Sequence, residues 1–178
     1  MQRTPRTVVL VGLMGVGKTS VGRRLAKALD LPFKDADAEI EQAAGRTISE
    51  IFAERGEAEF RAGERRVIAR LLRGPPLVLA TGGGAFIDVE TRRLIKETAV
   101  SVWLRADIEV LVRRVKRRDT RPLLRDQDPK AVLERLAAER YPVYAEADLT
   151  VETNESPHDA AVAAILAALR TQADLQRA

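Results

Sequence analysis

The sequence predicts an α/β fold in which helices pack on a parallel β-sheet. Short apolar runs alternate with helical patterns about five times along the chain, and this alternation is typical of a parallel sheet with crossover helices. Glycine-rich turns directly follow two of the apolar runs. No internal repeat or linker divides the 178 residues, which are enough for one domain with a hydrophobic core.

Most of the predicted strands are short, continuous apolar runs, as expected of strands buried inside a layered fold. The first run is rich in β-branched residues and ends in glycine. Trp103, in the fourth run, is expected to lie in the core rather than in a binding site. The predicted strands cover residues 7–11, 32–35, 77–80, 99–104 and 149–151.

The predicted helices show apolar residues on one face, at spacings of three and four. A capping-box pattern at residues 47–50 starts one of them, and Gly56 breaks that helix. Residues 117–128 are charged, contain Pro122 and have no period, so we expect a mobile loop there. The predicted helical segments are 18–29, 38–44, 47–55, 57–72, 89–97, 107–116, 131–141 and 157–169.

Composition excludes several classes of protein. The chain contains no cysteine, so it has no disulfides and no thiolate zinc site. No apolar run approaches the roughly 20 residues that span a membrane, and the polar start is too short for a signal peptide. We therefore expect a cytoplasmic protein. The net charge of +4 fits either nucleic-acid binding or the handling of small anions by arginine, and charge alone does not decide.

A phosphate-binding loop is the strongest motif. Residues 12–19 read Gly-Leu-Met-Gly-Val-Gly-Lys-Thr and match G-x-x-x-x-G-K-[ST] between a predicted strand and a predicted helix. The glycines let backbone N–H groups turn toward phosphate oxygens, and the helix N-terminus adds a positive dipole. Lys18 can reach the β- and γ-phosphates, and the Thr19 hydroxyl can bind Mg²⁺.

Missing motifs narrow the class of phosphate-loop protein. The chain has no N-K-x-D motif for reading guanine, so a GTPase is not expected. The apolar run 77–80 ends in Thr81 and three glycines instead of the acidic residue usual in motors and related ATPases. A small-molecule kinase is therefore the class that remains.

Two acidic residues follow the second predicted strand. In an extended segment Asp35 and Asp37 would face the same way. One carboxylate could then support Mg²⁺ through water, and the other could orient or deprotonate an attacking hydroxyl. The alternative is an acidic helix N-terminus in which Asp37 caps a helix from residue 38.

Other candidates have structural alternatives of their own. The glycines at 82–84 follow a strand, at the edge where α/β proteins bind ligands, but they could form a simple turn. Arg61 could be a surface partner of Glu57, four residues earlier. Arg121 and Arg140, each taken alone, fit solvated surface. His158, the single histidine, is assigned no role.

Taken together, these residues resemble the shikimate kinase family, over nearly the whole chain. The resemblance is carried by six segments in order: residues 12–19, 35–37, 59–61, 81–84, 121–124 and 140–144. It implies a single three-layer phosphate-loop kinase domain over residues 1–178, with a five-stranded parallel sheet in the order 2-3-1-4-5. It also implies a substrate-binding region at about 35–64 and a mobile lid at about 116–128. The implied reaction transfers the γ-phosphate of ATP to the 3-hydroxyl of shikimate, in chorismate and aromatic amino-acid biosynthesis.

The resemblance also implies roles for single residues. Asp37, Lys18 and Arg121 would be catalytic, and Thr19 with Asp35, through water, would hold Mg²⁺. Glu64 would stabilise the substrate arginines, and Phe52 and Phe60 would line the substrate ring. The implied ATP-binding residues are Gly15, Val16, Gly17, Lys18, Thr19, Ser20, Arg114, Arg121 and Ser156. The implied shikimate-binding residues are Asp37, Arg61, Gly82, Gly83 and Arg140.

Two alternatives remain open from the residues. The first is a gluconate kinase or another small-acid kinase on the same scaffold. The second is a basic nucleic-acid-binding module, which is disfavoured because the chain shows no nucleic-acid motif and no aromatic stacking set. We expect shikimate and ATP as partners, no binding to nucleic acid or membrane, and a monomer.

Overall fold

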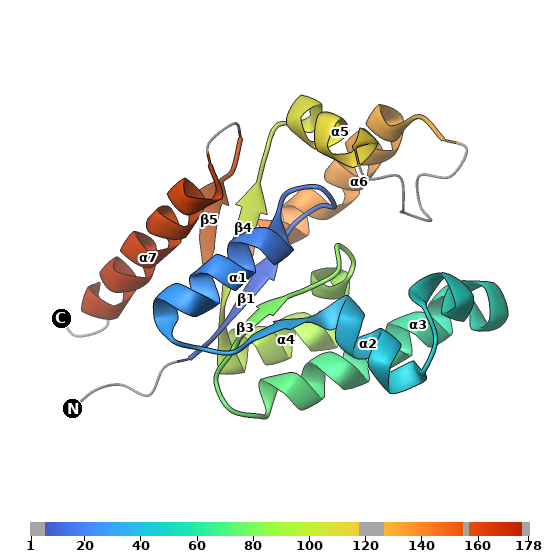
Figure 1. Cartoon of the computed structure of the whole chain (residues 1–178), viewed down its shortest axis with the longest axis horizontal. Coiled ribbons are helices and arrows are strands. Elements are labelled where there is room, and N and C mark those ends of the chain that lie inside the picture. Colours follow the sequence, from blue (N-terminus) through green and yellow to red (C-terminus); the bar gives the residue numbers. More distant parts are fainter. Residues whose placement is uncertain (1–5, 118–126, 155–156, 176–178) are drawn as a thin grey trace.

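The structure, a computed structural model that describes residues 6–117, 127–154 and 157–175, contains a five-stranded parallel sheet (Figure 1). The strand order is β2-β3-β1-β4-β5, so the predicted fold class and strand order are confirmed. The strands are β1 (Thr7–Val11), β2 (Phe33–Asp35), β3 (Val78–Ala80), β4 (Ala99–Arg105) and β5 (Leu149–Glu152).

The central strands are buried on both faces. Every residue of β1 is buried, and so are the first six residues of β4. This double burial explains why these strands appear in the sequence as continuous apolar runs instead of alternating ones. Trp103 of β4 is 5% exposed and its ring meets that of Tyr141 edge-on at 5.0 Å, which confirms its place in the core.

Helices cover both faces of the sheet and form the outer two of three layers (Figure 1). The connection from β1 to β2 runs in one direction across the sheet and the later ones run in the other. Because such crossovers are right-handed, α1 lies on one face while α3 and α4 lie on the other. Helix α7, which follows the last strand, packs beside α1. The helices are α1 (Lys18–Leu29), α2 (Ala36–Ala44), α3 (Ile48–Leu72), the 3₁₀ turn η1 (Ala85–Ile87), α4 (Val89–Thr98), α5 (Ile108–Lys116), α6 (Pro129–Tyr144) and α7 (His158–Leu175).

Several helix ends differ from the predictions: α6 begins at 129 instead of 131, and α7 ends at 175 instead of 169. Two further differences have a clear local cause. Helix α2 begins at Ala36, not at 38, because Asp35 is its N-cap and accepts hydrogen bonds from the next turn. Helix α6 continues through Pro142 to Tyr144 instead of ending at 141. Proline removes one N–H donor from a helix. Pro142 lies in the last turn of α6, and the helix ends only two residues after it. Gly56 adopts φ 80° inside α3, so the predicted break is confirmed as a kink.

A satellite core joins α2 to α3. Ile40 of α2 packs with Ile51, Phe60 and Val67 of α3, apart from the main core. These two helices therefore form a compact arm beside the carboxyl end of β2. Among the described residues, no helix combines the length and apolar character needed to cross a membrane.

Candidate active site

The phosphate loop follows β1 at the carboxyl edge of the sheet. Gly15 and Gly17 have φ values of 83° and 96°, a region that favours glycine. Gly17 is also the N-cap of α1, so the loop leads directly into a helix N-terminus. The loop borders a cavity of about 350 Å³. A positive helix end beside a glycine-rich loop is suited to binding phosphate.

Polar side chains of the loop gather at this cavity. The Lys18 ammonium donates to the carbonyls of Gly12 at 2.7 Å and Leu13 at 3.0 Å, which places its charge over the loop. Lys18, Thr19 and Ser20 all line the cavity, as does Gly15. The side chain of Val16 is buried instead, so any contact of Val16 with a nucleotide would use its backbone.

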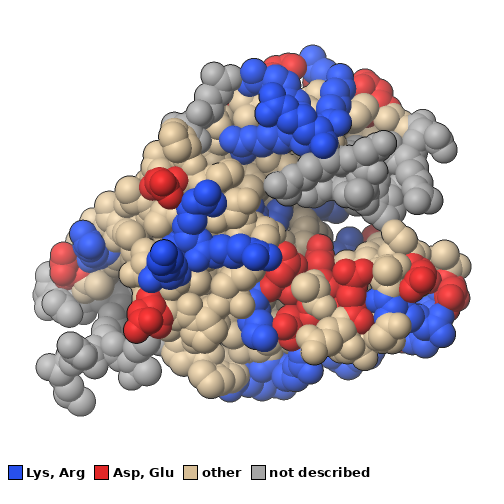
Figure 2. Space-filling view, viewed as in Figure 1, with Lys and Arg blue, Asp and Glu red and all other residues tan. Residues whose placement is uncertain are grey.

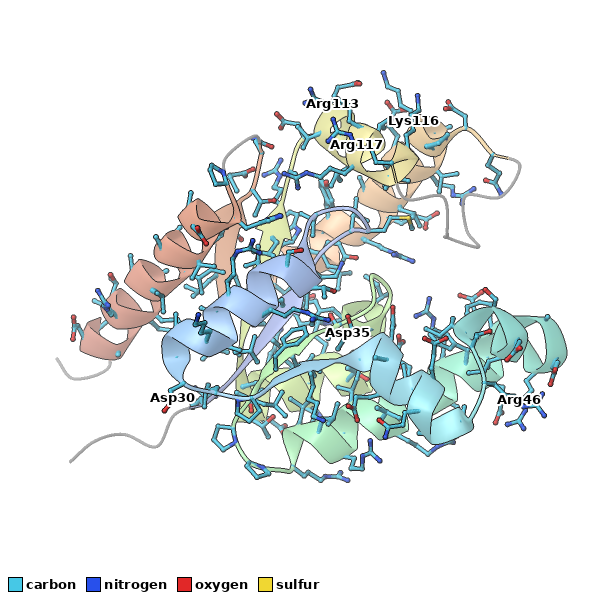
Figure 3. All side chains as sticks on the ribbon, viewed as in Figure 1. Asp30, Asp35, Arg46, Arg113, Lys116 and Arg117 are labelled. Atoms are coloured by element: carbon cyan, nitrogen blue, oxygen red, sulfur yellow. The ribbon has the colours of Figure 1, made fainter. Side chains whose placement is uncertain are left out.

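Asp35 and Asp37 reach the site in a different way from the one expected. Asp35 (Figure 3) is the last residue of β2, whereas Asp37 lies in the first turn of α2. The prediction of one extended segment is therefore wrong. The alternative of an acidic helix N-terminus is correct, but the cap is Asp35 and not Asp37. Asp35 caps the helix with Oδ1, which accepts from Asp37 N at 2.9 Å. Its Oδ2 accepts from the Thr19 hydroxyl at 2.9 Å, which joins the two predicted metal-site residues.

A second cavity of about 530 Å³ lies beside the first. The arm formed by α2 and α3 provides much of its wall, including Phe52 and Phe60, whose ring centroids are 4.8 Å apart. In Figure 2 the acidic side chains of α2 gather at the rim of a hollow in this region. The two cavities share four lining residues: Met14, Asp37, Gly82 and Gly83. Asp37 therefore lies at the boundary between a phosphate site and a neighbouring site.

The three glycines after β3 make room for side chains of the protein itself. A Cβ on Gly82 would lie 3.0 Å from Asp37 Oδ1 and 3.4 Å from Glu64 Oε2. A Cβ on Gly83 would lie 2.7 Å from Arg140 Nη1, and one on Gly84 would lie 2.5 Å from both terminal nitrogens of Arg61. The described neighbours of these glycines are therefore side chains that the sequence analysis assigned to the substrate site, and ligand binding at the glycines stays a prediction.

Arg61 and Glu64 form the most buried ion pair of the site. Arg61 Nη1 donates to Glu64 Oε1 at 2.9 Å, and the Glu64 side chain is 3% exposed. Arg61 also lies 3.6 Å from the exposed Glu57, so the expected surface pair exists but is not its main contact. Burial raises the pKa of Glu64, although Arg61 opposes this shift. Glu64 Oε2 has no hydrogen-bond partner among the described residues, which leaves an acceptor directed toward the glycines.

Arg140 is positioned beside Gly83 by a neighbour in its own helix. The Tyr144 side chain is fully buried and its hydroxyl donates to the Gly83 carbonyl. Burial raises the pKa of Tyr144 to about 12, with Arg140 acting in the opposite direction. The phenol is therefore neutral at pH 7 and can act as a donor. Tyr144 belongs to the predicted segment 140–144, but sequence reasoning gave it no role.

Arg114 connects the phosphate loop to the end of β5. Its guanidinium donates to the carbonyls of Val16 at 3.2 Å, Thr153 at 2.9 Å and Asn154 at 2.6 Å, and it lines the phosphate-loop cavity. Burial lowers the pKa of Arg114, and Arg113 adds to this effect. Arg121 and Ser156, also predicted for this region, lie outside the described residues.

Sequence reasoning missed two cationic or titratable residues at this cavity. Arg117, at the C-terminal end of α5 (Figure 3), lines the cavity, and so does His158 at the start of α7. Neither belongs to a recognisable motif, and only the packing of α5 and α7 brings them to the loop. Among the described residues no group of three or more acidic, histidine or cysteine side chains forms a metal cluster. A Mg²⁺ site made of Thr19 and Asp35 does not need such a cluster, because Mg²⁺ keeps several of its waters and is also coordinated by substrate phosphate oxygens.

Comparison with known proteins agrees with this geometry. A family model described as shikimate kinase matches residues 14–170. The chain is 69% identical to a shikimate kinase from Caulobacter vibrioides, over 93% of this chain and 82% of the relative. It is 57% identical to one from Paramagnetospirillum magneticum, over 98% and 90%.

Solved structures give the same result. The shikimate kinase from Acinetobacter baumannii in complex with shikimate matches with a TM-score of 0.91 and 39% identity, over 95% of both chains. A gluconokinase from Sinorhizobium meliloti matches with a TM-score of 0.66 and 22% identity, over 99% of this chain and 98% of its own, and this likeness extends to the fold alone. On this sequence and structural evidence, the chain belongs to the shikimate kinase family.

Proposed function

We propose that the protein transfers the γ-phosphate of ATP to the 3-hydroxyl of shikimate, forming shikimate 3-phosphate and ADP. The observation that supports it most is the position of Asp37, which lines both the phosphate-loop cavity and the adjoining cavity. A hydroxyl bound in the second cavity would meet a phosphate bound in the first beside this carboxylate. Positioning of this kind provides much of the catalysis in phosphoryl transfer.

The phosphate loop would bind ATP with its backbone N–H groups, and Lys18 would stabilise charge on the transferred phosphoryl group. Thr19 and Asp35, already joined by a 2.9 Å hydrogen bond, would hold Mg²⁺, Asp35 through a water molecule. When bound, Mg²⁺ would neutralise charge on the phosphate oxygens. Ser20 and Arg114 line the same cavity, which supports their assignment to the nucleotide.

The second cavity would bind shikimate by its carboxylate. Arg61 and Arg140 both line it, and guanidinium groups can form paired hydrogen bonds with a carboxylate. Glu64 holds Arg61 in place, and Gly82 and Gly83, which line both cavities, would contact the substrate through their backbone. Phe52 and Phe60 offer an apolar wall to the ring.

In the transfer step, a lone pair of the shikimate 3-oxygen attacks the γ-phosphorus, and the bond from this phosphorus to the β,γ-bridging oxygen breaks. The hydroxyl proton passes to the Asp37 carboxylate, and ADP leaves with the bridging oxygen. Arg121 is proposed to close over the γ-phosphate and stabilise its charge, and Ser156 to contact the adenine.

We further propose that residues 1–178 act as one kinase domain, with an acceptor region at about 35–64 and a lid at about 116–128. We expect a monomer that works in the cytoplasm, where ATP is available. Light scattering coupled to size-exclusion chromatography would test the oligomeric state, and fractionation of the cells would test the location.

Coupled ADP-release assays with shikimate, quinate and gluconate would test the proposed activity. We expect ADP formation that depends on shikimate and on Mg²⁺. ADP formation with gluconate and none with shikimate would overturn the assignment and favour the gluconate kinase alternative. Binding of DNA or RNA that weakens with salt, without ATP turnover, would favour the nucleic-acid alternative.

A further inference from the structure

His158 lies in the wall of the phosphate-loop cavity. It is the single histidine of the chain and the first residue of α7. A Cβ added to Gly17 would lie 3.1 Å from its Cε1 and 3.5 Å from its Nδ1. The imidazole therefore covers Gly17 directly, and it shares the lining of the cavity with Lys18, Arg114 and Arg117.

Contacts of the neighbouring segments bring the start of α7 close to the phosphate loop. Helix α7 packs along α1 (Figure 1), which begins at the loop. The end of β5, a few residues before His158, is attached to the same loop, because Arg114 bonds to carbonyls of both segments. The Thr153 hydroxyl adds a 3.3 Å bond to the Val16 carbonyl.

The charges near His158 suit an anion more than a cation. Of the described residues, three cationic side chains line the cavity, Lys18, Arg114 and Arg117, against two carboxylates, Asp35 and Asp37. Both carboxylates come from the β2–α2 junction and Asp35 is already engaged by Thr19. Further charged groups of the packed elements include Asp159 of α7, which pairs with Arg24 of α1 at 3.3 Å, and Glu152 of β5, which lies 3.9 Å from Arg105. Helix α1 also carries Arg23 and Lys27, and α7 carries Arg170 and Asp174.

We propose that His158 donates a hydrogen bond to the phosphate chain of the bound nucleotide and thereby makes nucleotide affinity depend on pH. This inference rests on the proposed ATP site in the phosphate-loop cavity. A phosphate beside the ring favours imidazolium, so the contact is strongest when His158 is protonated. Its contribution is full at low pH and is lost as the pH rises through the histidine pKa in the complex. Because an ordinary imidazole titrates near 6.5, the loss falls within about pH 6 to 8.

The single histidine allows a direct test by NMR. The Cε1–H signal of His158 can be titrated with pH in the free protein and at saturating adenosine, AMP and ADP. We expect ADP to raise the imidazole pKa by about 0.5 unit or more, and adenosine to leave it nearly unchanged. A pKa that ADP does not move, or that adenosine moves equally, would overturn the proposed phosphate contact.

Affinity measurements on variants provide the second test. By calorimetry, His158→Gln should bind ADP about fivefold more weakly than the wild type at pH 6.0, and within about twofold at pH 8.5, because only a charged donor gains the extra strength. Because ADP ionises in the same way in both experiments, its effect cancels in the ratio of the two proteins' ADP affinities at each pH. Asp159→Asn changes the charge of the next residue, which does not line the cavity, and should keep the wild-type pH profile.

The outcomes separate this inference from the proposed function. If ADP binds and shikimate is phosphorylated, but His158→Gln has the wild-type pH profile, the role of His158 is refuted while the kinase assignment remains. If calorimetry detects no ADP binding to the wild type, the proposed nucleotide site fails and the inference fails with it.

Discussion

Gly84 offers a selective test of the proposed carboxylate site. A Cβ at this position would lie 2.5 Å from the terminal nitrogens of Arg61, and ordinary contact begins at 3.4 Å. Gly84→Ala should therefore displace the guanidinium by about 0.9 Å. The Gly84 backbone, with φ −94° and ψ −10°, suits alanine without strain, so the effect should be confined to the arginine.

The displacement should weaken the binding of shikimate without affecting ATP. A misplacement of about 1 Å in a positioning group can cost on the order of 100-fold in rate, and we expect kcat/KM for shikimate to fall by roughly 10- to 100-fold. Most of the change should appear in KM for shikimate, because the proposed role of Arg61 is to bind the substrate before as well as during the reaction. Steady-state kinetics with each substrate varied in turn would measure both effects.

Gly63 supplies the matched control for this substitution. It lies in the same helix as Arg61, and a Cβ there would meet nothing closer than Arg66 Nη2 at 3.9 Å. Gly63→Ala should leave both KM values unchanged and stabilise the protein by up to about 1 kcal/mol, since alanine favours helix. If Gly84→Ala shows wild-type KM for shikimate, or if both variants raise it equally, the proposed role of Arg61 is refuted.

Three further substitutions test other parts of the site. Asp37→Asn should reduce phosphoryl transfer by about 10²- to 10⁴-fold and leave ADP affinity nearly unchanged in calorimetry; wild-type turnover would contradict the role of Asp37. Thr19→Val should raise the Mg²⁺ concentration needed for half-maximal activity, and Thr19→Ser should restore it; an unchanged Mg²⁺ dependence would exclude Thr19 from the metal site. Glu64→Gln addresses stability, because the folded state raises the pKa of Glu64 above 4.5. The wild type therefore loses stability, relative to this variant, as the pH rises from 4.5 through the folded-state pKa. Urea unfolding between pH 4 and pH 7 should show the free energy of unfolding of the wild type falling relative to that of Glu64→Gln as the pH rises. Parallel pH profiles of the two proteins would refute the raised pKa of Glu64.

Local patterns predicted the framework of this protein well. The phosphate loop is contiguous, so its strand, glycines and Lys18 could be recognised from spacing alone. The break at Gly56 and the burial of Trp103 also follow from local chemistry. The main local error concerned Asp35, because a carboxylate that ends a strand can also cap the following helix, and periodicity does not distinguish these states. Asp37 consequently belongs to a helix, not to an extended segment.

The sequence by itself determined the parallel α/β framework, the phosphate loop and, through resemblance, the family. Only the tertiary structure decided how the acceptor site is assembled. Arg61 and Arg140 are far apart in the chain, and they line the same cavity because α3 and α6 both reach the glycines after β3. The absence of side chains at Gly83 and Gly84 is what lets those guanidinium groups approach. A sequence pattern within one segment does not show which other segments lie close to it in the fold. For the same reason, the sequence did not indicate that His158 covers the phosphate loop.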